Sequence, residues 1–194
     1  MKPRTTVISV SFNSAQIIKK MLQSVPDNIA IKIVDNCSID NISETVSNFN
    51  NCELIENASN QGFGRACNLG ASESKTEFLF FLNPDAMIDH ETISELEKFA
   101  DKNPQMGAAN PLIKSINNKS KLKMSSIIPC KDLQRPKISE FGEMPILTGG
   151  ALFVRRKVFE DIGGFDPHIF LYHEDHELCS RISKLGYSLW HVPK

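Results

Sequence analysis

The sequence predicts an α/β fold in which helices cover both faces of a mostly parallel central sheet, a Rossmann-like arrangement. Short β-rich runs alternate with stretches whose apolar residues recur at helical spacing, and the strands are continuously apolar, as in residues 78–82. Continuous apolar strands indicate burial on both faces, which is typical of parallel sheets. The chain has 194 residues, of which 41% are hydrophobic and 23% charged, ordinary values for one globular domain.

The amino-terminal part is predicted to hold two strand–helix units. Residues 5–12 are rich in β-branched residues and predict a strand, and apolar residues recur at helical spacing over 17–22. Residues 29–34 predict the second strand. Asp40 is expected to cap the helix that follows, which carries apolar residues over 42–49.

Two more strand–helix units complete the first half. Residues 52–56 predict a third strand, and a glycine-rich turn over 60–64 leads into a short helix over 65–72. The apolar run 78–82 predicts the most buried strand, and a helix with one apolar face follows over 89–101.

The second half is predicted to be less regular. Residues 114–140 are polar, lysine-rich and aperiodic, which predicts a long excursion over the surface. Order returns with a strand over 146–154 that contains Gly149 and Gly150, where a ligand or another part of the backbone can approach closely. A short helix over 157–162 follows.

The last predicted helix starts near residue 174 and is expected to bury a stripe formed by Leu178, Ile182 and Leu185. It leads into a final strand over 188–192. No internal repeat is apparent, so we expect a single domain.

Charge and composition exclude several functional classes. The formal net charge of -1 lacks the basic surface that nucleic acids require, so we expect no nucleic-acid partner. The five cysteines include no C-x-x-C pair, which favours reduced thiols in a cytosolic protein. The longest purely apolar run, residues 78–82, is far too short to span a bilayer, and no signal-peptide core is visible. Any membrane association is therefore expected to be peripheral.

Polar residues follow three of the predicted strands. Asn13 follows the first strand, Asp35 and Asn36 follow the second, and Asn83-Pro84-Asp85 follows the strand at 78–82. The carboxyl ends of parallel strands meet at one edge, where such folds bind ligands. Asp85 can bind a hard divalent cation that holds phosphate oxygens, although Asn-Pro-Asp is also a common turn sequence. Asp35 and Asn36 can order a nucleotide or cap a helix.

Two other segments carry polar side chains that can act together. Gly62 lies in a turn that matches neither a Walker motif nor a dinucleotide fingerprint. Arg65 and Asn68 share one face of the next helix, where they can reach a ligand or stay solvated. Glu174 and Asp175 either complement a helix dipole or supply a general base at the mouth of the crevice.

These segments belong to a series of motifs in a fixed order. The series is Val7–Ser14, Val34–Asp40, Asn60–Asn68, Phe80–Asp85, Thr148–Ala151, Gly163–Asp166 and Tyr172–Arg181. It resembles family 2 glycosyltransferases of the GT-A fold, particularly their rhamnosyltransferase-like branch, over nearly the whole chain. The resemblance implies an inverting transfer of a sugar from a nucleoside-diphosphate sugar donor to a glycan or lipid-linked acceptor, in bacterial surface polysaccharide biosynthesis.

The resemblance also implies roles for single residues. Donor binding falls to Phe12, Asn13, Asp35, Asn36, Gly62, Arg65, Asn68, Asn83 and Asp85. Asp85 would also hold Mg or Mn, Asp175 would be the catalytic base, and the two are expected to face one pocket. Acceptor contacts fall to Gly149, Gly150 and Glu174. Residues 1–110 would form the donor half of the domain and 111–194 the acceptor half.

The chain departs from the family pattern at some positions. Asn83 stands where the first of two metal-binding aspartates is common, and Phe12 stands where tyrosine is common. Relatives run on past Pro193, so the carboxy-terminal part is expected to be truncated, and the protein is expected in the cytoplasm or peripherally at the inner face of the membrane.

The favoured donor is dTDP-rhamnose, which supplies L-rhamnose, with UDP-hexoses or galactofuranose donors as alternatives. A second alternative is a non-catalytic nucleotide-sugar-binding or assembly module. A nucleotidylyltransferase is disfavoured because Ser11–Ser14 lacks a glycine-rich, arginine-containing loop.

Overall fold

The structure is a computed structural model that describes residues 3–114 and 139–193. Most of the surface excursion predicted for 114–140 lies outside these residues. In chain order the elements are β1 (Thr5–Ser11), α1 (Ala15–Ser24), β2 (Ala30–Asp35), α2 (Ile42–Val46), β3 (Cys52–Glu56), α3 (Phe63–Ser72), β4 (Phe78–Leu82), α4 (Thr92–Lys102), β5 (Met106–Pro111), β6 (Gly142–Glu143), β7 (Ala151–Arg155), α5 (Arg156–Asp161), α6 (Glu174–Lys184) and β8 (Ser188–Val192).

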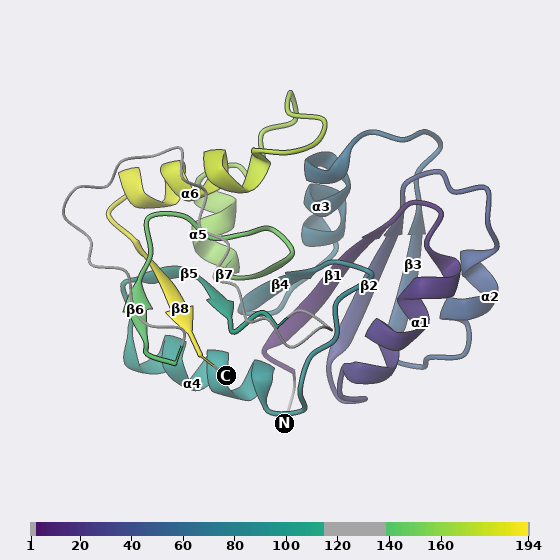
Figure 1. Ribbon diagram of the computed structural model, residues 1–194. Coiled ribbons are helices and arrows are strands. Elements are labelled where there is room, and N and C mark those ends of the chain that lie inside the picture. Colours follow the sequence, from purple (N-terminus) through teal and green to yellow (C-terminus); the bar gives the residue numbers. More distant parts are fainter. Residues whose placement is uncertain (1–2, 115–138, 194) are drawn as a thin grey trace.

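The strands of the described part form one eight-stranded sheet in the order β3-β2-β1-β4-β7-β5-β8-β6. Strands β3, β2, β1 and β4 pair in parallel, as do β5 and β8, whereas β7 runs antiparallel to β4 and β5 and β6 antiparallel to β8. The predicted mostly parallel sheet is therefore confirmed. The sheet continues without a break from β3 at one edge to β6 at the other (Figure 1).

The sheet has a hydrophobic core on each face. Helices α1, α2 and α4 pack on one face, where the fully buried Phe78 and Phe80 point, and α3, α5 and α6 pack on the other, with Leu79 and Phe81. In Figure 1, α1 and α4 lie below the sheet and α3, α5 and α6 above it. Successive side chains of a strand point to opposite faces, so a strand buried on both must be apolar throughout. The apolar run predicted to be the most buried strand is β4 for this reason.

Two strands were not predicted from the sequence, β5 and β6. Strand β5 has no β-branched residue, which is why its propensity is weak. Its small residues serve packing instead, because a Cβ on Gly107 would lie 2.6 Å from Ile182 Cγ2 and 2.8 Å from Tyr187 Cβ. Helix α6 and the residue before β8 thus pack directly on the backbone of β5.

Three predicted details of the elements are wrong. The strand expected from residue 146 begins only at Ala151, because the preceding glycines form a turn. Leu185 lies just beyond α6 and is 52% exposed, so it is not part of the buried stripe. Asp40 does not cap α2, because the cap of that helix is Asn41. Instead, Asp40 Oδ2 accepts the Ala15 N–H at the start of α1 at 2.8 Å.

The cysteines of the described part are free thiols, and Cys130 lies outside it. Burial raises the pKa of the Cys179 thiol to about 12 and also raises the pKa of Cys67. Among the described residues, no helix has both the length and the apolar character needed to cross a membrane.

Close packing of α3 on β1 and β2 gives a stability prediction. A Cβ on Gly70 would lie 2.6 Å from Ile8 Cγ2 and 3.1 Å from Val34 Cγ2. We expect Gly70→Ala to lower the free energy of unfolding by about 1–3 kcal/mol, because the helix must move off the sheet. Ser72→Ala, on the exposed side of the same helix, should stay within about 0.5 kcal/mol of the wild type in urea unfolding. Equal effects of the two substitutions would contradict the close packing.

Candidate functional site

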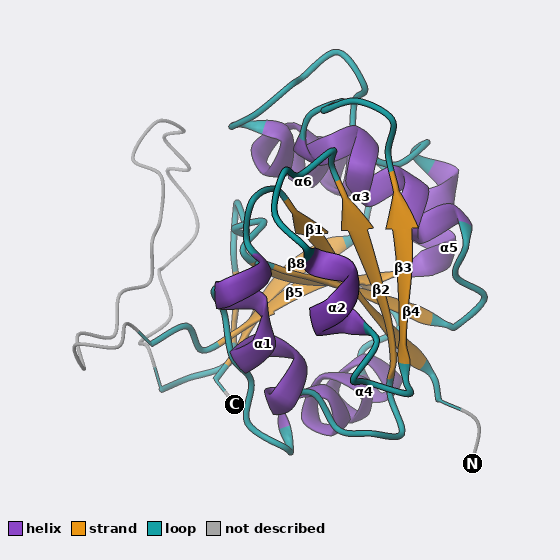
Figure 2. Cartoon of the chain, turned by 90° about the vertical axis from the view of Figure 1, so that its right-hand side faces the viewer, coloured by secondary structure: helices purple, strands orange, loops and turns teal. Residues whose placement is uncertain are grey.

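The predicted polar residues gather where β1, β2 and β4 end. Strands β1 and β2 pair up to Ser11 and Asp35, and the Asn36 N–H donates to the Ser11 carbonyl at 2.8 Å. The arrowheads of β1, β2 and β3 share the upper edge of the sheet in Figure 2. The loops after β1 and β2 therefore form one continuous surface.

Asp35 and Asn13 connect the loops after β1 and β2. The buried Asp35 carboxylate accepts the Ser38 N–H at 3.1 Å and the Ser38 hydroxyl. Asn13 N–H donates to Ser38 Oγ at 2.8 Å, and Asn13 Oδ1 accepts the Ile39 N–H at 2.9 Å. Asn13 (φ 54°) adopts the left-handed conformation that asparagine tolerates. The Phe12 ring, 51% exposed, lies at the rim of this network and is open to a ligand.

Asn36 organises the loop that leads into α3. Its Nδ2 donates to Asn60 Oδ1 at 2.8 Å and to the Gly62 carbonyl at 3.3 Å. Its Oδ1 accepts from Asn57 Nδ2 and from the Gln61 N–H, both at 3.1 Å. These four bonds use both donors and both acceptor positions of the amide, so Asn36 shapes the loop at the end of β2.

Gly62 lies where two distant segments meet. Its φ is 87°, and a Cβ there would lie 2.4 Å from the Phe170 carbonyl oxygen, so no other residue fits without rearrangement. The neighbouring Phe63 N–H donates to the same carbonyl at 2.9 Å. The loop before α3 is thereby joined to the segment before α6.

Arg65 and Asn68 share a face of α3, as expected, and that face contacts the segment after α5. Both polar groups of the Asn68 amide bond to the backbone of Phe165 at 2.8 Å. Arg65 Nε donates to the Pro167 carbonyl at 2.7 Å. Their observed contacts are structural, and the exposed guanidinium of Arg65 keeps further donors available.

The Thr148–Gly150 turn brings the end of β4 and the start of α6 together. The Asn83 N–H donates to the Gly150 carbonyl at 3.0 Å, and the Gly149 N–H donates to Asp175 Oδ2 at 3.0 Å. A Cβ on Gly149 would contact Asp175 Cβ at 3.4 Å, and one on Gly150 would contact Asn83 Nδ2 at 3.4 Å. The two glycines therefore leave the space beside Asp175 and Asn83 open.

Helix α6 begins directly after two residues in the left-handed conformation, and its first turn is acidic. Tyr172 (φ 66°) and His173 (φ 68°) are both left-handed, and the first helical turn that follows carries Glu174, Asp175 and Glu177. Negative charge is favourable at a helix amino terminus. The Asp175 carboxylate is 19% exposed, and its Oδ1 accepts the His176 N–H at 2.8 Å. A carboxylate held at both oxygens in this way is fixed in orientation and still has lone pairs for a proton.

Glu174 has the opposite surroundings. It is 7% exposed, and its Oε2 has no hydrogen-bond partner among the described residues. Burial raises the pKa of the Glu174 carboxyl, and the negative charge of Asp175 acts in the same direction. The side chain thus lies in the protein interior, and its contact with an acceptor stays a prediction.

Asp85 is the residue expected to hold a metal ion. It is exposed two positions after Asn83, and no hydrogen bond to its carboxylate is found within the described residues. The described part has no group of three or more His, Cys, Asp or Glu side chains arranged to hold a metal. One exposed carboxylate still fits Mg²⁺ or Mn²⁺, because Mg²⁺ is commonly bound by one or two carboxylates together with substrate phosphates and water.

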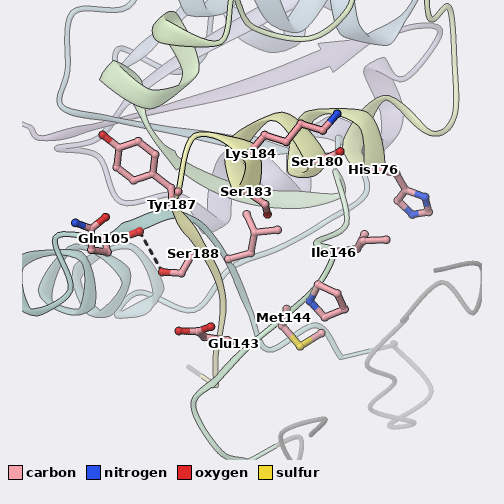
Figure 3. Close-up of a pocket in the computed structure, with 13 residues that line it drawn as sticks. Gln105, Glu143, Met144, Ile146, His176, Ser180, Ser183, Lys184, Tyr187 and Ser188 are labelled. Atoms are coloured by element: carbon pink, nitrogen blue, oxygen red, sulfur yellow. Dashed lines mark hydrogen bonds between the residues drawn. The ribbon is translucent and has the colours of Figure 1, made fainter. Parts of the chain in front are cut away.

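A hollow of about 780 Å³ lies beside α6, between this helix, residues 143–146 and the start of β8 (Figure 3). Its lining includes Ser180, Ser183 and Lys184 of α6 together with Met144 and Ile146. None of the predicted site residues lines it. His176 lines the hollow, and its Nε2 is 3.9 Å from Asp175 Oδ1, so the hollow begins next to Asp175.

Asn110, whose amide bonds to the Thr148–Gly150 turn, is not among the residues predicted from the sequence. It lies in β5, which was not predicted. A signal was present, because Asn110-Pro111 ends an apolar run as Asn83-Pro84 ends β4.

The sheet and its flanking helices have the GT-A fold. A mannosyltransferase from Pyrobaculum calidifontis, solved with GDP-Man and Mn²⁺, superposes with a TM-score of 0.77 at 21% identity, covering 100% of this chain and 56% of that one. S. aureus TarS 1-349 superposes with a TM-score of 0.70 at 19% identity over 98% of this chain and 60% of that one. The expected GT-A fold is confirmed, and the chain spans somewhat more than half the length of these proteins.

The glycosyl transferase family 2 profile matches residues 6–163, and the chain belongs to this family. A curated relative in Mycobacterium tuberculosis, N-acetylglucosaminyl-diphospho-decaprenol L-rhamnosyltransferase, is 27% identical over 96% of this chain and 73% of its own length. Rhamnosyltransferase WbbL of Escherichia coli K12 is 25% identical over 96% of this chain and 80% of its own length. The protein is a glycosyltransferase with rhamnosyltransferase-like relatives.

The buried Glu174 gives a pH prediction. The folded protein holds this proton more tightly than the unfolded chain, whose carboxyl has its ordinary pKa of 4.5. Stability should therefore fall as the pH rises through and above that value. We expect Glu174→Gln to raise the free energy of unfolding relative to wild type at about pH 8, and the gain to shrink towards about pH 4.

The measurement is urea unfolding across this pH range, with the exposed Glu56→Gln as control. A gain for Glu174→Gln that is the same at all pH values, or a loss that grows with pH, would show that the carboxyl is not penalised by burial.

Proposed function

We propose that this protein is an inverting glycosyltransferase that moves a sugar from a nucleoside-diphosphate sugar to a glycan or lipid-linked acceptor in bacterial surface polysaccharide biosynthesis. The observation that carries the proposal is a pair of hydrogen bonds, from the Asn83 N–H to the Gly150 carbonyl and from the Gly149 N–H to the Asp175 carboxylate. They bring the fixed Asp175 carboxylate to the same turn as the strand end that leads to Asp85. Membership of glycosyl transferase family 2 supports the reaction class.

Asp175 is proposed as the general base. Gly149 N–H and His176 N–H orient its two oxygens, and one remaining lone pair takes the proton of an acceptor hydroxyl. The hydroxyl oxygen forms a bond to the anomeric carbon of the donor as the bond from that carbon to the diphosphate breaks. Attack from the side opposite the leaving group inverts the configuration, and a single displacement needs no covalent nucleophile.

Donor binding is proposed for the strand ends. Ser11 at the end of β1 pairs with Asp35 at the end of β2, and the exposed Phe12 follows Ser11 directly. There a carboxylate can accept a nucleobase N–H, and an exposed ring can stack on the nucleobase. Asp85 would hold Mg²⁺ or Mn²⁺ together with the diphosphate. When bound, such an ion offsets the charge that develops on the leaving nucleoside diphosphate.

L-Rhamnose is the proposed sugar, with dTDP-rhamnose as donor. The support is that two curated relatives are named rhamnosyltransferases, and one of them is named for a lipid-linked acceptor, N-acetylglucosaminyl-diphospho-decaprenol. Residues 1–110 would form the donor half and 111–194 the acceptor half. A lipid-linked acceptor would place the protein in the cytoplasm at the inner face of the membrane.

The direct test is a panel of sugar nucleotides that includes dTDP-rhamnose, UDP-hexoses and UDP-galactofuranose, with release of nucleoside diphosphate as the measurement. Release from dTDP-rhamnose alone supports the proposed donor, and release from a UDP-sugar replaces it. Binding without release from any donor, in the presence of glycan and lipid-linked acceptors, would favour a non-catalytic module.

Removing the proposed base should stop transfer and spare donor binding. We expect Asp175→Asn to lower kcat by about 10²–10⁴-fold, the usual contribution of a general base, with nucleoside diphosphate affinity unchanged. Glu177→Gln removes another carboxylate from the same helical turn, one that pairs with Arg181, and should keep its rate. Full activity of Asp175→Asn would rule out Asp175 as the base.

Removing the proposed metal ligand should have the complementary effect. We expect Asp85→Ala to weaken Mn²⁺-dependent binding of UDP or dTDP by at least about 10-fold, because even indirect partners of a metal contribute that much. Asp89→Ala, an exposed acid of the same segment, is the matched control. Calorimetric titration with and without Mn²⁺ measures both, and an unchanged affinity would remove Asp85 from the metal site.

A further inference from the structure

Asn110 is a polar side chain inside a buried apolar strand. It is 7% exposed, and the preceding Ala108 and Ala109 are fully buried. A buried carboxamide costs free energy unless its groups are hydrogen-bonded. Asn110 Nδ2 donates to the Thr148 carbonyl at 3.0 Å and to the Ala151 carbonyl at 2.5 Å, and Oδ1 accepts the Thr148 N–H at 2.8 Å. All three partners are backbone groups at one turn.

The amide continues the pairing of β5 with β7 beyond the last backbone pair. The register between the two strands includes Ala109 opposite Phe153, and the Asn110 amide reaches two residues further to Ala151 and on to Thr148. The turn has weak support of its own, because its internal bond from the Gly150 N–H to Thr148 Oγ1 is 3.5 Å long. Its two glycines contribute no side chains that could pack. Asn110 therefore constrains the position of the turn, together with the Asn83 N–H, which donates to the Gly150 carbonyl at 3.0 Å.

This turn also carries the N–H group that orients Asp175. The Gly149 N–H donates to Asp175 Oδ2 at 3.0 Å, one residue after the peptide that Asn110 binds at Thr148. A shift of the turn would move that donor relative to the carboxylate. Displacements of about 1 Å at a reacting group can lower a rate by about 10²-fold.

We propose that Asn110 is a positioning residue for Asp175, acting through the Thr148–Gly150 turn. The inference rests on the proposed role of Asp175 as base. The side-chain hydrogen bonds of Asn110 go to Thr148 and Ala151, whereas Asp35 and Asp85 lie on the loops after β2 and β4. The proposed donor residue Asn83 meets the turn through its backbone N–H, which donates to the Gly150 carbonyl. The chemical step should therefore depend on Asn110, and nucleotide binding should not.

The first test separates rate from binding. We expect Asn110→Ala to lower kcat by about 10–100-fold, and Asn110→Ser, whose hydroxyl can still donate to one carbonyl, to lower it less. The dissociation constant and stoichiometry for UDP or dTDP with Mn²⁺ should match wild type, which also shows that the variants are folded. An unchanged kcat, or a rate loss matched by an equal loss of nucleotide binding, would overturn the proposal.

Asn51→Ala is the matched control. The Asn51 amide also binds backbone carbonyls, those of Pro26 at 3.4 Å and Ile29 at 2.8 Å, but at the opposite end of the sheet, before β2 and β3. We expect this variant to lose stability and to keep kcat. A loss of kcat as large as that of Asn110→Ala would mean that buried amides act only through stability, which overturns the proposal.

The second test asks whether Asn110 acts through Asp175. The assay is a single turnover with radiolabelled donor. We expect Asn110→Ala to lower the transfer rate when Asp175 is present. We expect the same substitution to leave the residual rate of the Asp175→Asn variant unchanged, because no base is left to orient. The same fold loss in both backgrounds would overturn the positioning role while leaving Asp175 as the base. Full activity of Asp175→Asn alone would instead overturn the proposed base, and the positioning role with it.

Discussion

The site depends on the antiparallel pairing of β7 with β4. Their register sets Leu82 opposite Ala151, so the end of β4 and the beginning of β7 meet at one edge of the sheet although they are far apart in sequence. The turn before β7 then bonds to Asn83 on one side and to Asp175 on the other. A parallel β7 would begin at the opposite edge and separate the donor side from the proposed base.

This arrangement explains why a largely parallel fold contains one antiparallel strand in its middle. The parallel part, β3-β2-β1-β4, presents strand ends that suit a nucleotide, as parallel sheets generally do. Strand β7 starts at the same edge, and the turn before it carries two glycines, which place no side chain beside Asn83 and Asp175. Helix α6 adds its acidic first turn, reached through two left-handed residues. The proposed donor and acceptor surfaces can thus meet at one edge of the sheet.

Much of the fold could be predicted from the sequence because burial on both faces leaves a continuous apolar run, as in β4. Strand β5 could not, since alanine and glycine carry little strand propensity, and its identity depends on close contact with α6 and Tyr187. The end of the buried stripe of α6 was also missed: helical periodicity alone does not show that the helix stops before Leu185.

The acidic residues of the site were predictable because they follow strands or begin a helix. The hydrogen-bond partners of the asparagines could not be predicted in the same way. Asn36, Asn68 and Asn110 each bind backbone groups of another segment, and the partner of Asn68 is 97 positions away. Sequence shows that a carboxamide is present, whereas only the tertiary structure shows which backbone groups it binds. The contacts of Asn68 with Phe165 and those of Asn110 with Thr148 could therefore not be predicted, and donor binding by Asn68 stays a prediction.

A crystal structure with a nucleoside diphosphate and Mn²⁺ tests the central claim most directly. We expect the nucleobase to lie at the paired ends of β1 and β2, and Mn²⁺ to be held by the diphosphate and the Asp85 carboxylate. We expect the Asp175 carboxylate to face the terminal phosphate, where the sugar of the donor would be attached. A nucleotide bound instead in the hollow beside α6 would contradict the central claim, and so would an Asp175 carboxylate that points away from the diphosphate.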